Sequence, residues 1–296
     1  MFSDFNVLLN SRRGHAKLVV AAAHDEFTLD AVFSAADVFN LEYQLVGNEE
    51  KIKQICEKLK KEPGNVIHVA EDEEIAKKSV SLIKEVTDAV LVKGHIETST
   101  LLRAVVNKEY GIRRAKTMSH IAFLEIPAYK KLLAVTDGGM CASPSLEQKI
   151  DIVKNALNLY KNMASSDYIP KVAALAASET LNPKLEDSVH GDELKKLAAS
   201  GEFGNVIFEG PISFDLAVSE KSAEKKGYSS PLCGDVDIFL VPGITAGNVL
   251  CKCLIEWAGA KMAGVVVGAA APIVLVSRSA SAEEKLNSIA LCVGGR

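Results

Sequence analysis

The chain of 296 residues is 48% hydrophobic and 24% charged, and its formal net charge at pH 7 is −4. These values are typical of a globular protein long enough for one large domain or two ordinary ones. The net negative charge excludes a general attraction to nucleic acid or to an anionic membrane, so local positive groups must hold any anionic substrate.

Cysteine usage and hydropathy indicate a cytoplasmic protein. The six cysteines lack metal-ligand spacing, and Cys251 and Cys253 are expected to point to different faces of one helix. The six histidines form no HxxxH or HExxH pattern, so no metal site is expected. No apolar run approaches the roughly 20 residues of a membrane span. The N-terminal residues do not have the charge order of a signal peptide, and we expect reduced thiols.

The first part of the chain alternates short β-rich runs with amphipathic helical patterns. The predicted strands lie at residues 18–23, 43–47, 66–70 and 89–94, and the predicted helices at residues 29–39, 49–61, 72–84 and 99–107. This alternation predicts an α/β protein with mostly parallel sheets that are covered by helices on both faces. In such sheets ligands bind beyond the carboxyl ends of the strands.

The middle of the chain breaks this alternation. Residues 119–127 and 131–139 predict an antiparallel pair, and residues 145–163 predict a long helix. The alternation then resumes, with predicted strands at residues 171–177, 206–210, 237–242, 264–270 and 273–276.

The most informative segment is residues 271–291, APIVLVSRSASAEEKLNSIAL. A buried strand ends in Ser277-Arg278, and a helix opens near Ser281 with Glu283 and Glu284 in its first turn. A guanidinium and a hydroxyl beside a helix N-terminus can together hold an anion next to the reacting atoms of a substrate. The alternative is a Ser-Arg pair in a solvent-exposed turn.

The segment resembles the C-terminus of phosphate butyryltransferases, within the phosphate acetyl/butyryltransferase family. The resemblance extends from about Lys17 to Cys292 and rests on several long motifs in the right order. These motifs are residues 90–113, 119–127, 146–156, 171–184, 209–220 and 234–252. The resemblance implies reversible transfer of an acyl group, butyryl or similar, between coenzyme A and inorganic phosphate. It further implies acyl-CoA, inorganic phosphate and acyl phosphate as ligands, no tightly bound cofactor, and a homodimer or larger homo-oligomer.

The resemblance also implies a fold of two α/β domains separated by a cleft, as in the isocitrate and isopropylmalate dehydrogenases. Residues 1–112 with 264–296 would form the first domain, and residues 113–263 the second. The reaction would then take place in the cleft.

The resemblance assigns the catalytic roles to Ser277, Arg278 and Glu284. Arg278 would hold the acyl phosphate, Ser277 would donate to the carbonyl oxygen or the incoming sulfur, and Glu284 would be the base. Full deprotonation of a thiol gains only about 2 kcal/mol at neutral pH, whereas positioning both substrates contributes roughly 7–11 kcal/mol. Arg278 should therefore matter more than Glu284. Glu283 is an alternative base, and both glutamates also suit the helix dipole.

Substrate binding is expected from two further groups of residues. Arg103 is a candidate contact for a coenzyme A phosphate, with Lys93, Thr98 and Ser99 at the start of the same helix; the alternatives are a solvated arginine and plain N-capping. Gly210 and Asn248 are the remaining candidates. Gly210 should form a strand-to-helix turn with the next residue, and Asn248 should cap a helix or form a hydrogen bond at the cleft.

One segment departs from the family. Gly138-Gly139-Met140-Cys141 replaces bulkier residues and a final Asn, which predicts a more mobile segment of changed polarity whose role stays open. Two other enzyme activities are alternatives: phosphate acetyltransferase, and phosphate acyltransferase dependent on acyl carrier protein. A coenzyme A-binding protein without turnover is the non-enzyme alternative. The sequence contains neither a Walker A motif nor a GxSxG elbow.

Overall fold

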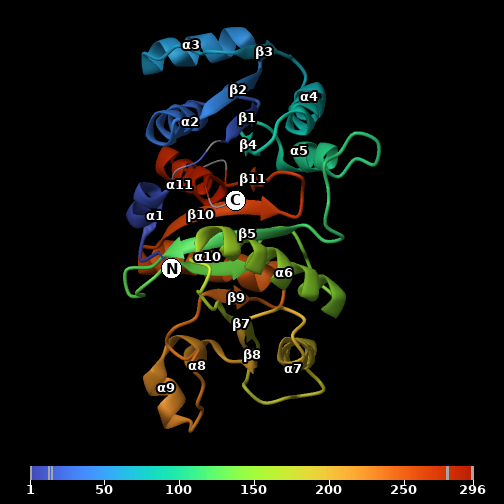
Figure 1. Cartoon of the computed structure of the whole chain (residues 1–296), viewed down its shortest axis with the longest axis vertical. Helices are drawn as coiled ribbons and strands as arrows, with labels where there is room; N and C mark the ends of the chain where they lie inside the picture. Colours follow the sequence, from blue (N-terminus) through green and yellow to red (C-terminus); the bar gives the residue numbers. More distant parts are fainter. Residues whose placement is uncertain (1, 13, 15, 278–279, 295–296) are drawn as a thin grey trace. The chain divides into compact units, whose positions relative to one another are not determined.

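A computed structural model describes residues 2–12, 14, 16–277 and 280–294 (Figure 1). Contacts between residues divide the chain into two units. We call residues 5–118 with 263–296 the N-terminal unit, and residues 1–4 with 119–262 the central unit.

The N-terminal unit is built on strands in the order β3-β2-β1-β4-β11-β10. Neighbouring strands run parallel from β3 to β11, and β10 is antiparallel to β11. The interior strands β1 and β4 are almost wholly buried, as expected for parallel strands with both faces covered. The strands are β1 Lys17–Ala21, β2 Glu42–Gly47, β3 Val66–His68, β4 Ala89–Lys93, β10 Lys261–Val267 and β11 Ile273–Val274.

Six helices accompany this sheet among the described residues. They are α1 Phe5–Ser11, α2 Glu26–Phe39, α3 Glu49–Leu59, α4 Asp72–Glu85, α5 Thr98–Val105 and α11 Ala282–Cys292. Helix α3 shows why the sequence folds this way locally: the Asn48 side chain accepts from the Lys51 amide at its start, and Ile52 and Cys56, four residues apart, form its buried stripe. Helices α2 and α11 pack on each other, as do α4 and α5.

The central unit has strands in the order β5-β6-β9-β7-β8. Strands β5 and β6 are antiparallel, with Ile121 opposite Thr136 and Leu124 opposite Leu133, which confirms the predicted pair. The other neighbours are parallel. The strands are β5 Ser119–Glu125, β6 Leu133–Thr136, β7 Lys171–Leu175, β8 Ile207–Ile212 and β9 Ile238–Leu240.

Helix α6, Leu146–Met163, confirms the predicted long helix. Ser145 and Gln148 form a capping box at its start, and Ile152, Ala156 and Tyr160 recur on its buried face. The other helices of the central unit are α7 Glu186–Ala199, α8 Phe214–Val218, α9 Glu220–Lys225 and α10 Ile244–Ala258.

The predicted α/β class with mostly parallel strands is confirmed. Three helices were not predicted, α1, α7 and α9. The last strand ends at Val274 and not at Val276. The dehydrogenase-like arrangement, the domain bounds and the cleft stay predictions. In the described part of the chain, no helix combines the length and the apolar character needed to cross a membrane.

Candidate active site

Two adjacent parallel strands of the N-terminal unit end at the same edge of the sheet. Leu91 and Val92 of β4 pair with Ile273 and Val274 of β11. Lys93 and the segment that leads to Ser277 therefore leave the sheet at its carboxyl edge, where α/β proteins bind ligands. Arg278 lies outside the described residues.

Ser277 is exposed beyond the end of β11. Its carbonyl oxygen accepts a hydrogen bond from the Ala280 amide at 3.1 Å. The backbone of Ser277 thus has a structural contact while its side chain is exposed, and its chemical role stays a prediction.

Helix α11 opens with a capping box. The Ser281 hydroxyl accepts from the Glu284 amide at 3.2 Å, and the Glu284 carboxylate accepts from the Ser281 amide at 2.8 Å. Glu284 is half-buried, whereas Glu283 is exposed. The spacing S-x-x-E signals this box in the sequence, and it gives Glu284 a structural role in addition to the proposed chemical one.

A buried ion pair, which the sequence did not predict, holds the first turn of α11. Lys285, 4% exposed, places its Nζ 2.9 Å from Asp25 Oδ2, just before α2, and the Thr28 hydroxyl donates to the same oxygen. Burial alone would raise the pKa of Asp25, but the hydrogen bonds from Thr28 and Lys285 outweigh it and lower that pKa. The pair therefore fixes α11 beside the start of α2.

Lys93 is the last residue of β4 and is only 6% exposed. Its Nζ lies 3.4 Å from the Gly94 carbonyl oxygen. Thr98 and Ser99 are the first two residues of α5, and the N-cap is Glu97. The alternative that Thr98 or Ser99 merely caps this helix does not apply, because both residues lie inside it. Their role in substrate binding stays a prediction.

Arg103 is exposed in the last turn of α5, four residues after Ser99. Residues four apart share one helix face, so the structure brings Ser99 and Arg103 together on an accessible surface. Arg103 has no ion-pair partner among the described residues, which fits a side chain available to a ligand.

Gly210 does not form the predicted strand-to-helix turn. It lies inside β8, where the register with β7 shifts, and the chain turns only at Ser213, the N-cap of α8. A Cβ at Gly210 would lie 2.7 Å from the Ala174 Cβ and 2.9 Å from the Gly191 carbonyl oxygen. Close packing of α7 on β8 therefore explains this glycine, and its role in substrate binding stays a prediction.

Asn248 is not a helix cap. The N-cap of α10 is Gly243, and Asn248 is exposed in the second turn of that helix. The glycines of the GITAGN segment serve packing: a Cβ at Gly247 would lie 2.6 Å from the Gly138 Cα. Contact of Asn248 with substrate stays a prediction.

The segment that departs from the family is anchored by Asp137. One carboxylate oxygen accepts the amides of Gly139 and Met140, both at 2.7 Å, and the other accepts the His120 amide at 3.0 Å. The expected mobility is not the reason for the paired glycines, because side chains there would collide with α10 and with His120. Burial, and secondarily the Asp137 charge, raises the pKa of Cys141 to about 12, so this thiol is not a nucleophile at neutral pH.

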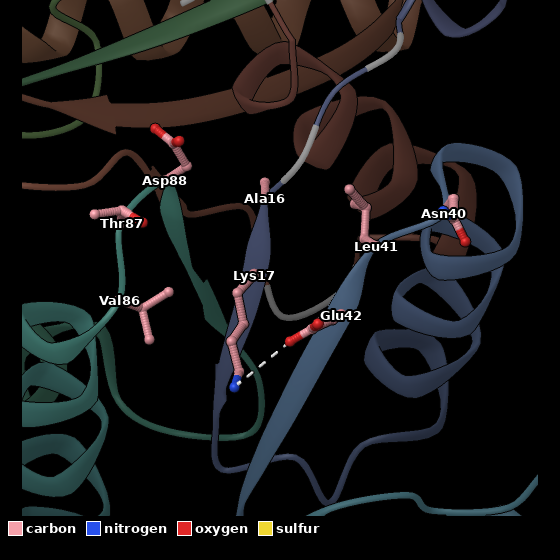
Figure 2. Close-up of a pocket in the computed structure, with 8 residues that line it drawn as sticks. All are labelled: Ala16, Lys17, Asn40, Leu41, Glu42, Val86, Thr87 and Asp88. Carbon is pink, nitrogen blue, oxygen red and sulfur yellow. Dashed lines mark ion pairs between the residues drawn. The ribbon is translucent and has the colours of Figure 1, made fainter.

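The opposite edge of the N-terminal sheet holds a cavity of about 420 Å³ (Figure 2). The chain segments that precede β1, β2 and β4 line it, and the Lys17 ammonium lies 3.8 Å from the Glu42 carboxylate. None of the predicted site residues lines this cavity.

Among the residues that the structure describes, no group of three or more His, Cys, Asp or Glu side chains is placed to hold a metal ion. All six cysteines are free thiols.

A parallel sheet with polar residues and helix N-termini beyond its carboxyl edge is the architecture of an α/β enzyme. The family model described as "Phosphate acetyl/butaryl transferase" matches residues 48–293, and the chain belongs to this family of acyltransferases. A probable phosphate butyryltransferase of Bacillus subtilis is 40% identical over 276 residues, which are 93% of this chain and 92% of that protein. A phosphate acetyltransferase of Thermotoga maritima is 37% identical over 286 residues, 96% of this chain and 97% of that protein.

Solved structures agree with the sequence relatives. The crystal structure of a branched-chain phosphotransacylase from Enterococcus faecalis V583 has a TM-score of 0.80 and 31% identity, and the match covers 94% of this chain and 97% of that one. The resemblance that the C-terminal motif indicated is thereby confirmed over nearly the whole chain.

Proposed function

We propose that the protein transfers a short acyl group, butyryl or similar, reversibly between coenzyme A and inorganic phosphate. The observation that carries this proposal is the family match over residues 48–293, a range that includes Ser277 and Arg278. Named relatives include both phosphate butyryltransferases and phosphate acetyltransferases. The 40% identity to a butyryltransferase favours the longer acyl group.

The proposed step is a direct displacement in a ternary complex. The coenzyme A sulfur attacks the carbonyl carbon of the acyl phosphate, the C–S bond forms, and the C–O bond to phosphate breaks. The electron pair of that bond leaves with inorganic phosphate, and the thiol proton passes to Glu284. The reverse reaction returns the proton to the thiol as phosphate attacks the thioester.

Each proposed residue has one task in this step. Arg278 grips the phosphoryl oxygens in a forked, charged contact, and Ser277 donates to the carbonyl oxygen as negative charge develops there. Arg103 and Ser99 contact a coenzyme A phosphate from their shared face of α5, with Lys93 and Thr98 beside them. Gly210 and Asn248 complete the predicted binding set.

Turnover with a series of acyl donors tests the proposal. Purified protein should release free thiol from butyryl-CoA in the presence of inorganic phosphate. Initial rates from two to six carbons, in both directions, identify the preferred chain. A preference for acetyl would favour the phosphate acetyltransferase alternative, and activity only with acyl carrier protein would favour the other enzyme alternative. If the protein binds coenzyme A but turns over none of the acyl donors, the result would support the alternative of a coenzyme A-binding protein without enzyme activity.

The rank of the catalytic residues is tested by paired variants. Arg278→Ala should lose more than about 100-fold in kcat/KM, the loss typical of removing an oxyanion contact. Glu284→Gln should lose at most about 30-fold, because deprotonation supplies only about 2 kcal/mol. If both variants lost the same amount of activity, positioning of the substrates could not be the main source of the rate enhancement.

We also propose that the chain forms a homodimer or a larger homo-oligomer. Helix α10 carries an apolar stripe with four-residue spacing: Val249 is 55% exposed, Cys253 is half-buried and Trp257 is 87% exposed. Lys252 and Glu256 flank the stripe, so an antiparallel copy of α10 would bring each lysine opposite a glutamate of its partner. A second copy therefore suits this surface in its apolar stripe and in its charge. The cytoplasmic location stays a prediction.

A further inference from the structure

The segment between β1 and α2, residues 22–25, is bonded to its neighbours on two sides at the carboxyl edge of the N-terminal sheet. The amide of His95, which follows β4, donates to the Ala22 carbonyl oxygen at 2.9 Å. The Ala23 amide donates to the carbonyl oxygen of Val46, in β2, at 3.1 Å. Since β2 and β4 flank β1 in the sheet, both neighbouring strands fix this segment, which we call the β1–α2 loop.

Asp25, the last residue of the β1–α2 loop, joins it to α11. Its Oδ2 accepts from the Thr28 hydroxyl, in the first turn of α2, and from Lys285 Nζ at 2.9 Å. Lys285 is buried, and among the described residues Asp25 is the one carboxylate that forms an ion pair with it. A buried charge without a counter-charge is costly, so Lys285 keeps the first turn of α11 against the loop.

The same turn of α11 has a second contact, with strand β10. The Ser288 hydroxyl donates to the Glu284 carbonyl oxygen at 2.7 Å and accepts from the Gly264 amide of β10 at 2.9 Å. Ser288 is fully buried. The backbone at Glu284 is thus fixed through Ser288, and the next residue, Lys285, is fixed through its side chain.

Two of the proposed catalytic residues depend on where this turn of α11 lies. Glu284 directly precedes Lys285, and its carboxylate is bonded to the Ser281 amide in the capping box. Ser277 lies just before this box, and its carbonyl oxygen accepts from the Ala280 amide. A shift of the first turn of α11 would therefore move Glu284 and the chain that leads back to Ser277. Displacements of about 1 Å can cost roughly a hundredfold in rate.

We propose that Asp25 and Lys285 are positioning residues for the acyl transfer, because their ion pair sets the place of Glu284 and Ser277 without either partner contacting substrate. This role rests on the proposed function and adds two residues to it. The proposed contacts with coenzyme A lie on α5, and the bond from the loop to His95 is a backbone bond that a new side chain at Asp25 leaves in place. The pair should therefore act on kcat and not on coenzyme A binding.

Steady-state kinetics with butyryl-CoA and inorganic phosphate tests this role. Lys285→Met keeps an unbranched apolar side chain and removes the charge, so it should lower kcat roughly ten- to hundredfold with an unchanged KM for butyryl-CoA. The matched control is Asp37→Asn, which breaks an exposed ion pair of α2 with Lys61 and should keep the kcat of the wild type. A wild-type kcat in Lys285→Met, or a raised KM with normal kcat, would overturn the positioning role.

A double-mutant cycle separates loss of the pair from misfolding. Asp25→Asn keeps an oxygen for the Thr28 hydroxyl but leaves Lys285 buried without a counter-charge, which destabilises the fold. The double variant Asp25→Asn/Lys285→Met has no buried charge there and should melt at a higher temperature than Asp25→Asn. Its kcat should still be as low as that of Lys285→Met, because both changes break the same contact. Losses of kcat that multiply in the double variant, or a wild-type kcat there, would contradict the pair.

The wild type and the variants distinguish the two proposals. A wild type that transfers no acyl group from any donor would overturn the proposed function, and the positioning role would fall with it. Acyl transfer by the wild type that stays unchanged in Lys285→Met and in the double variant would overturn the positioning role alone.

Discussion

The carboxylate of Glu284 accepts a hydrogen bond from the backbone amide of Ser281 at 2.8 Å, one turn earlier at the start of α11. The side chain that is proposed as the base thus also stabilises the helix that follows the catalytic motif. A loss of activity on mutation of Glu284 therefore has two separable sources, proton transfer and helix capping.

Glutamine and alanine at residue 284 separate these sources. Glutamine preserves a capping box, so Glu284→Gln should keep the melting temperature of the wild type while activity falls. Glu284→Ala also loses the cap and should be less stable by about 1 kcal/mol. Thermal denaturation with initial-rate kinetics measures both effects, and Glu283→Gln, an exposed neighbour, is the control. An equal loss of activity in Glu283→Gln would show that local charge and not Glu284 is responsible.

Arg103 should act on coenzyme A binding and not on the chemical step. It is exposed on the same face of α5 as Ser99, and a charged contact with a phosphate stabilises a complex by about 1.5–3 kcal/mol. Arg103→Ala should therefore raise the KM for coenzyme A at least about tenfold with little change in kcat.

Steady-state kinetics with coenzyme A and with its 3′-dephospho form identifies which phosphate is involved. If Arg103 contacts the 3′-phosphate, the variant and the wild type should have similar KM values for the dephospho form. Lys84→Ala, an exposed cation on α4, is the control. An unchanged KM in Arg103→Ala would remove Arg103 from the proposed site.

The sequence predicted features that depend on local pattern. Helix α6 was predicted because its capping box and its buried stripe all lie within one stretch of the chain. The carboxyl-edge position of Ser277 followed from the apolar run before it. Gly210 was misread because its close neighbour, Gly191, lies on α7, a helix that the sequence pattern did not predict. The pair of Asp25 and Lys285 joins residues that are 260 positions apart, a relationship that no local pattern contains.

Gly210 should prove to be a packing residue. A methyl group there would press on the Ala174 Cβ and on the Gly191 carbonyl oxygen, and overpacking of this kind costs roughly 1–3 kcal/mol. Gly210→Ala should lower the free energy of unfolding by that amount, measured by urea denaturation. The double variant Gly210→Ala/Ala174→Gly should recover part of the loss. A normal stability with a raised KM would instead support substrate contact.

Acid should destabilise the central unit through Asp235. Burial alone would raise the pKa of this carboxyl group, but hydrogen bonds from Lys171, Lys130 and Lys131 outweigh it and hold that pKa far below its usual range. A carboxyl group with a lowered folded-state pKa stabilises the protein above its unfolded pKa of about 3.9, and this stabilisation is lost as the pH falls below that value.

The variant Asp235→Asn tests this pH dependence. Its melting temperature should lie below that of the wild type at pH 7, and the gap should close as the pH falls from about 5 to about 2. Thermal denaturation across this range measures the gap, with Glu57→Gln, an exposed residue of α3, as the control. A gap that is constant with pH would show that the ionised form of Asp235 does not stabilise the fold.

Trp257 should lie in the contact between two copies of the chain. At 87% exposed it is the most exposed large hydrophobic residue among those described, and interfaces gain much of their free energy from such aromatic side chains. Trp257→Ser should shift the protein from dimer to monomer at micromolar concentration, as measured by light scattering after gel filtration.

Charge reversal at Lys252 tests the antiparallel pairing of α10 with its copy more sharply. Lys252→Glu places glutamates opposite each other across the two-fold axis and should weaken the dimer, whereas Lys252→Glu/Glu256→Lys restores opposite charges and should restore it. A wild-type protein that is monomeric at these concentrations, or a double variant no better than Lys252→Glu alone, would contradict antiparallel pairing of α10.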